Sequence, residues 1–80
     1  MLKELKSAQK VIGAKQVGRA LRSGQAQRVY LAENADPRVT EPIEMLCSEA
    51  GIPVEKIPTM AQLGNACGIA VGSAVAAIVE

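Results

Sequence analysis

The junction Gly13-Ala14-Lys15-Gln16, followed by Arg19, combines residue types that suit contact with a nucleic acid. Gly13 and Ala14 lack bulk, so a nucleic-acid backbone could come close to them. A helix N-terminus offers free backbone N–H groups and a positive dipole end to phosphate, and Lys15 and Arg19 add charge. Arg19 can donate two hydrogen bonds to the O6/N7 edge of guanine, and Gln16 offers an amide to another base edge. From composition alone, a helix with ordinary exposed polar positions is an equally good interpretation.

The loop Ile69-Ala70-Val71 is a second candidate surface. Three apolar residues directly after a helix could form an apolar lip beside the basic helix end. The simpler interpretation is structural: Ile69 makes the hydrophobic contact of a Schellman motif at the end of the helix. Taken by itself, the loop favours this structural interpretation.

Catalysis and metal binding find little support in the residue types. The chain has no His, so it has neither a Ser-His-Asp or Cys-His arrangement nor an imidazole ligand. Cys47 and Cys67 alone cannot fill the usual four-ligand zinc site, and we predict that they are reduced core residues. Glu33 and Asp36 could pair as carboxylates, but acidic residues in strand-end loops often form turns. We therefore predict a protein that is not an enzyme and has no metal, cofactor or small-molecule substrate.

The basic residues are concentrated at the start of the chain. Residues 1–28 hold seven Lys and Arg against one acidic residue, and residues 29–80 hold two against seven. The net charge of +1 is thus the sum of +6 and −5. Such asymmetry favours a polyanion-facing surface over charges scattered on a solvated surface. One Tyr and no Trp or Phe argue against the aromatic stacking modules that bind single-stranded nucleic acid.

Eighty residues, of which 49% are apolar, suffice for one domain with a small core. Hydrophobic spacing predicts helices over about residues 2–9, 15–23, 41–50 and 60–67, a strand stub at 11–12, and strands over 29–32, 54–57 and about 74–79. Thr40 is the expected N-cap of the third helix, and Thr59 with Gln62 forms a capping box for the fourth. Strands separated by helices imply crossovers, and therefore a mainly parallel or mixed sheet with helices on both faces.

Residues 57–79 carry no charge and are long enough to raise the question of a membrane span. Glycines and polar residues interrupt this segment, and its longest apolar run, Ala74–Val79, fits a buried strand. The first residues lack the apolar run of a signal peptide. We therefore predict a cytoplasmic protein without a membrane segment.

Several segments, taken together, resemble the kink-turn-binding ribosomal protein family of the large subunit (the L-seven-Ae type). They are Gly13-Ala14-Lys15-Gln16 with Arg19, Val29–Pro37, Leu46-Cys47, Gly51-Ile52-Pro53 and Leu63–Ile69. Their order and spacing cover about residues 10–79, and the chain is most similar to the short bacterial members.

The resemblance implies an α/β fold, a three-layer α-β-α sandwich with a small mixed sheet, that binds kink-turn RNA. Such RNA is a duplex bent sharply at a bulge flanked by tandem sheared G·A pairs. In the family, residues matching Lys15, Gln16 and Arg19 contact those guanines in the major groove, which the bend opens. The loop matching Ile69–Val71 packs against the bulge nucleotides, and the position of Asp36 lies near them.

The expectation is a single domain over residues 1–80, a monomer that stabilises kink-turn RNA in ribosomal or regulatory RNA. The expected RNA-binding residues are Gly13, Ala14, Lys15, Gln16, Arg19, Asp36, Ile69, Ala70 and Val71. The chain departs from relatives in having Lys15-Gln16 where archaeal and eukaryotic members have Asn-Glu, Met60 where many have Lys, and Ala70 where many short members have Glu. The alternative is a protein-interaction or assembly module with only nonspecific affinity for RNA.

Overall fold

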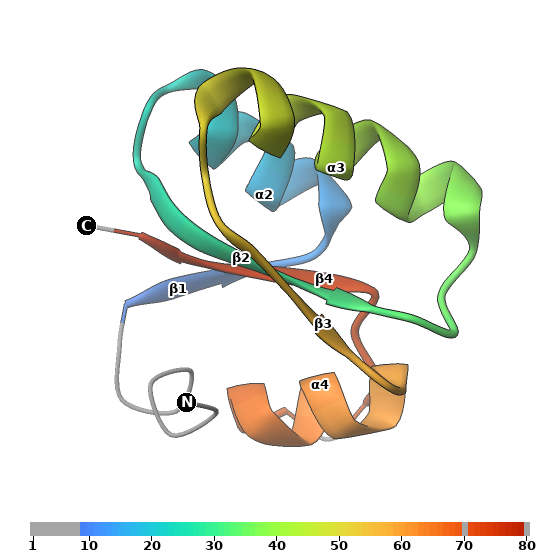
Figure 1. The fold of residues 1–80 in the computed structure, drawn as a ribbon. Coiled ribbons are helices and arrows are strands. Elements are labelled where there is room, and N and C mark those ends of the chain that lie inside the picture. The colour runs from blue at the N-terminus through green and yellow to red at the C-terminus, as the bar shows by residue number, and fades with distance from the viewer. Residues whose placement is uncertain (1–8, 70, 80) are drawn as a thin grey trace.

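A computed structural model describes residues 9–69 and 71–79, so the helix predicted over residues 2–9 lies almost wholly outside the described residues (Figure 1). Within these residues the chain forms three helices and one four-stranded sheet. In chain order they are β1 (Lys10–Ile12), α2 (Ala14–Arg22), β2 (Ala26–Ala32), α3 (Pro37–Ala50), β3 (Val54–Ile57), α4 (Met60–Cys67) and β4 (Val75–Val79). None of the helices described is long and apolar enough to cross a membrane.

The sheet has the strand order β1-β4-β2-β3 and is mixed. β4 runs antiparallel to both of its neighbours, β1 and β2, whereas β3 lies parallel to β2. α2 and α3 cover one face of the sheet and α4 covers the other (Figure 1). The three-layer α-β-α sandwich with a small mixed sheet is thereby confirmed.

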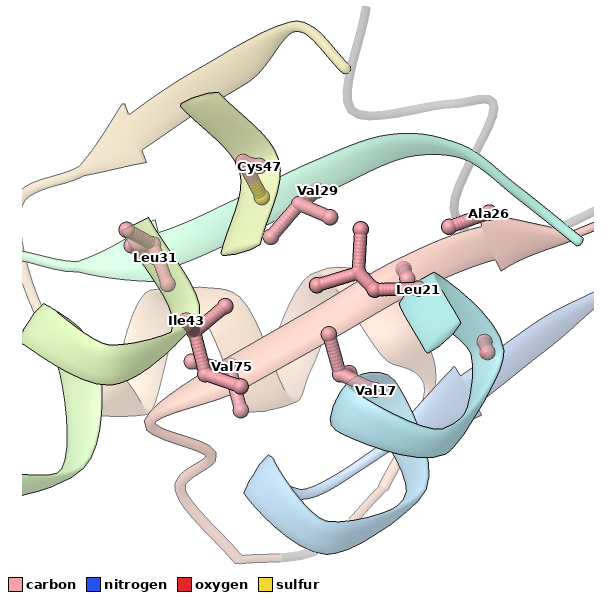
Figure 2. Packing of buried hydrophobic residues seen from close by; sticks show 10 residues of the cluster. Val17, Leu21, Ala26, Val29, Leu31, Ile43, Cys47 and Val75 are labelled. Atoms are coloured by element: carbon pink, nitrogen blue, oxygen red, sulfur yellow. The ribbon is translucent and has the colours of Figure 1, made fainter. Parts of the chain in front are cut away.

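Alternate residues of β2 point to opposite faces of the sheet, as the pleat of a strand requires. Val29 and Leu31 belong to the core under α2 and α3, and Figure 2 shows them opposite Ile43 and Cys47 of α3. Tyr30 belongs to the second core, under α4. The apolar run in this strand is therefore covered on both sides, as predicted.

The two cysteines lie in different cores, on opposite faces of the sheet. Cys47 and Cys67 are both buried and free of a disulfide. Burial raises the pKa of both thiols, which keeps them protonated and unreactive. Both are small apolar core residues, as predicted.

Two predicted element boundaries are wrong. α3 begins at Pro37 with Asp36 as its N-cap, four residues before the predicted start at Glu41. The Asp36 carboxylate accepts a hydrogen bond from the Arg38 N–H at 2.9 Å, and proline is well suited to the first helical position. Thr40, the predicted cap, is buried inside the first turns of α3. β2 begins at Ala26, before the predicted start at Val29, because Ala26 pairs with the end of β4.

Candidate nucleic-acid interface

Gly13 is the N-cap of α2, and among the described residues no side chain caps this helix end. Gly13 has φ 100° and ψ 149°, a conformation that residues with a Cβ rarely adopt. Its carbonyl oxygen accepts the Val17 N–H at 3.0 Å, which closes the first turn. The remaining N–H groups of that turn, which no side chain caps, form the positive end of the helix dipole.

The polar residues of α2 lie on its outer side. Val17, Ala20 and Leu21 are buried against the sheet, whereas Lys15, Gln16, Arg19 and Arg22 are exposed. Lys15, Arg19 and Arg22 follow the spacing i, i+4, i+7 and so form one cationic stripe along the helix. The structure thus brings together Gly13, Ala14, Lys15, Gln16 and Arg19 at one helix end.

Three further segments lie at the same end of the sheet as this helix start: the beginning of β4 and the loops that follow β2 and β3. The Gly13 N–H donates to the Val75 carbonyl oxygen at 3.0 Å, which ties the start of α2 to the start of β4. The Ala32 N–H donates to the Ala74 oxygen at 2.9 Å, and the Glu33 N–H donates to the Ile57 oxygen at 2.7 Å. The loops that follow β2 and precede β4 therefore lie at the same end of the sheet as the start of α2, on the right of Figure 1.

The segment between α4 and β4 leaves the helix through a Schellman motif. Gly68 has φ 81°, its N–H donates to the Asn65 oxygen at 3.0 Å, and the Ile69 N–H donates to the Gly64 oxygen at 3.1 Å. Ile69 is half-buried against the core under α4, which agrees with the simpler interpretation of this residue. Ala70 lies outside the described residues.

Residues 71–73 are held against α4 by close backbone contacts. The Ser73 N–H donates to the Met60 oxygen at 3.0 Å, and the buried Ser73 hydroxyl donates to the Val75 oxygen at 2.7 Å. Gly64 has no room for a Cβ, because the Val71 carbonyl oxygen and Gly72 lie directly above it. The Val71 side chain is nevertheless 70% exposed. The structure therefore presents a large apolar side chain to solvent from a fixed backbone.

The ribosomal protein L7Ae/L30e/S12e/Gadd45 family model matches residues 1–80 of this chain. The chain belongs to this family. The RNA-binding protein YbxF of Geobacillus stearothermophilus is 44% identical over 78 residues, which are 98% of this chain and 95% of that protein. An RNA-binding protein of Bacillus pumilus is 38% identical over 68 residues, 85% of this chain and 83% of that protein.

The fold of this L7Ae-family protein also matches a solved structure, the 15.5kD RNA binding protein of Giardia lamblia. The TM-score is 0.88 at 29% identity, and the match covers 99% of this chain and 68% of the other. The printed names of these relatives are those of RNA-binding proteins. Across residues 9–69 and 71–79, no three His, Cys, Asp or Glu residues gather as a metal site would need.

Asp36 has a structural role in this L7Ae-family protein that the sequence did not reveal. Besides capping α3, its carboxylate accepts hydrogen bonds from Nε of Arg38 at 3.1 Å and from Nη2 at 2.8 Å. These contacts with Arg38 lower the pKa of Asp36. A second missed contact is the Asn34 side-chain oxygen, which accepts the Met60 N–H at 2.8 Å and so links the β2–α3 loop to the start of α4. An Asn after a strand suggests a bond to nearby backbone, but not one 26 residues away.

The Asp36–Arg38 pair should make the stability of the protein depend on pH. Because the pKa of Asp36 is lowered in the folded state, the ionised carboxylate adds stability above the ordinary Asp pKa of about 4. This stability is lost as the pH falls through the lower pKa of the folded state. Asp36→Asn retains a capping oxygen without the charge, so we expect it to unfold at a lower urea concentration than wild type near neutral pH.

The difference in stability between wild type and Asp36→Asn should narrow as the pH falls from about 4, the ordinary Asp pKa, through the lower pKa of the folded state. Both side chains are exposed, so solvent limits the size of the effect. Urea unfolding followed by circular dichroism across this pH range measures it. A difference that stays constant with pH would show that the charge of Asp36 does not stabilise the fold.

Proposed function

We propose that this protein binds RNA and recognises a kink-turn, in which tandem sheared G·A pairs flank a bulge. Family membership and the names of its relatives support RNA binding. The observation that carries the finer proposal is the hydrogen bond between the Gly13 N–H and the Val75 oxygen. It joins a helix end rich in hydrogen-bond donors to the segment that presents Val71, so that one RNA can contact both.

Each part of this surface has its own task in the proposed complex. The N–H groups at the start of α2, together with Lys15, hold backbone phosphates. Gln16 and Arg19 hydrogen-bond guanine edges in the major groove, where the bend gives them access. Val71, with Ile69 and Ala70, contacts the unstacked bulge nucleotides. Asp36 lies near these nucleotides and keeps the start of α3 in place.

The protein binds the bent RNA better than the extended RNA and so shifts the population towards the bent form. It acts as a cytoplasmic monomer without a cofactor, on ribosomal RNA or on a regulatory RNA element. Its surface suits RNA in which base edges are already accessible, because the chain has a single aromatic residue, Tyr30, and that residue is buried.

The test compares a kink-turn RNA with the same RNA in which the sheared G·A pairs are replaced by G·C pairs. At one fixed salt concentration we expect clearly tighter binding of the kink-turn, accompanied by bending that fluorescence energy transfer between the two stems reports. Equal affinity for both RNAs would refute kink-turn recognition and leave only attraction to a basic surface. A stable oligomer without affinity for either RNA, seen by light scattering, would favour an assembly module instead.

A further inference from the structure

A groove of about 350 Å³ separates α2 from α3 on the outer surface of the sandwich. It is lined by Ala14, Lys15, Gly18, Arg22, Arg38, Val39, Pro42, Ile43 and Leu46. Three of these residues are cationic, and no acidic residue lines the groove among the parts of the chain that the structure describes. We call it the α2/α3 groove.

Two of the three cations that line the α2/α3 groove, Arg22 and Arg38, have contacts that orient them. Both Nη atoms of Arg22 lie 3.8 Å from the point where a Cβ would stand on Gly18, so the guanidinium folds over the space that this glycine leaves open. Lys15 precedes Arg22 by two helical turns, about 10 Å along the axis. Arg38 enters from the other wall, where the Asp36 carboxylate orients it and offsets its charge, so Lys15 and Arg22 supply the net charge of the groove.

The floor of the groove is apolar, since Val39, Ile43 and Leu46 form it together with Ala14. Charges of one sign above walls of low dielectric constant focus the electrostatic potential and concentrate counter-ions. The groove therefore attracts a linear anion that can span its length. It is also continuous with the proposed RNA surface, because Lys15 belongs to both.

We propose that the α2/α3 groove binds the sugar–phosphate backbone of one helical stem of the RNA, beyond the sheared G·A pairs. This inference rests on the proposed function and extends it from the kink to the adjoining duplex. Charge complementarity and the shared Lys15 favour the backbone of an RNA already bound at the start of α2 over an acidic protein segment.

The test uses kink-turn RNAs with short stems and RNAs in which each stem in turn is longer by about one turn of A-form helix. Wild type should bind one of the lengthened RNAs more tightly than the short one. Arg22→Ala should weaken binding of that lengthened RNA by about threefold to tenfold at moderate salt. The slope of log affinity against log salt concentration should become shallower by about one. Binding of the short RNA should stay unchanged, because Arg22 lies two turns from the start of α2.

Arg28→Ala is the matched control, since it removes the same charge from the opposite face. Arg28 lies two residues before Tyr30 in β2 and therefore points to the face that α4 covers. We expect Arg28→Ala to weaken binding of the short and the lengthened RNAs equally. Urea unfolding of both variants ensures that the folded proteins are compared.

Three results would overturn the inference about the groove. The first is a wild-type protein that binds neither lengthened RNA more tightly than the short one. The second is an Arg22→Ala variant that loses the same affinity for the short and the lengthened RNAs. The third is an Arg22→Ala variant with unchanged RNA binding but weaker binding of polyglutamate, which would assign the groove to an acidic peptide. All three leave kink-turn recognition intact, whereas loss of discrimination between the G·A and G·C RNAs refutes the proposed function itself.

Discussion

Gly64→Ala is expected to destabilise the fold by about 3 kcal/mol and to weaken RNA binding at least about tenfold. A methyl group on Gly64 would overlap the Val71 carbonyl oxygen, which belongs to the backbone and cannot rotate away as a flexible side chain would. The segment is also held by the hydrogen bonds of Ser73 to Met60, in the first turn of α4, and to Val75. Either α4 or this segment must therefore move, and the exposed Val71 side chain moves with it.

Gly18→Ala is the matched control for this prediction. The atoms nearest to a Cβ on Gly18 lie at 3.8 Å, which is ordinary contact distance, so the methyl group fits. Alanine is also the better helix former by about 1 kcal/mol, so this variant should be as stable as wild type or more stable. Urea unfolding gives the free energy of unfolding of both variants. A Gly64→Ala protein as stable as wild type would show that the segment is not clamped.

Val71→Ala separates the loss of stability from the loss of RNA affinity that Gly64→Ala is expected to cause together. The side chain is exposed, so its truncation should change the free energy of unfolding by less than about 0.5 kcal/mol. Under the proposed function it should still weaken RNA binding, because the apolar contact with the bulge is lost. Unchanged affinity in Val71→Ala would remove this segment from the proposed RNA surface.

Arg19→Ala is expected to cost about 1–3 kcal/mol of RNA-binding free energy, which is about fivefold to 150-fold in affinity. Arg19 lies one turn into α2 on the same outer side as Gln16, where a bidentate contact to guanine can form. Because the side chain is exposed, the free energy of unfolding should stay within about 0.5 kcal/mol of wild type. Titration of the kink-turn RNA at fixed salt gives the affinity.

Arg19→Lys is the sharper control, since it retains the charge but not the planar fork of donors. If Arg19 binds a guanine edge, the lysine variant should lose most of the discrimination between the G·A and G·C RNAs. Full discrimination in Arg19→Lys would place Arg19 on a phosphate, where a point charge is sufficient.

The sequence predicted those elements whose ends carry strong local signals. The fourth helix has its capping box, and the structure shows the Thr59 hydroxyl accepting the Gln62 N–H at 3.1 Å. The alternation of helices and strands likewise predicted the layers. The start of α3 was predicted wrongly because this stretch contains two candidate N-cap residues. Thr40 was predicted, whereas the structure uses Asp36, which proline follows. Asp36 followed by proline is itself a local signal for a helix start, and Thr40, four residues later, is buried within the helix.

The candidate site was predictable as a list of residue types, but not as a surface. Charge counted along the chain places Arg38 in the acidic part, whereas the fold brings it into the α2/α3 groove that Lys15 also lines. The contacts of Gly13 with Val75 and of Gly64 with Val71 depend on backbone approach. The spacing of residue types along the sequence does not show which backbone segments come close together in the fold.

The position of β4 in the sheet has a consequence for how the chain folds during synthesis. β4 is made after every other described element, yet it lies between β1 and β2 and supplies residues to both cores. Until its residues leave the ribosome, β1 has no neighbouring strand and the start of α2 has no anchor at Val75. The domain therefore cannot close from its N-terminus step by step. Its folding waits for the last strand, as is typical of proteins whose contacts join distant parts of the sequence.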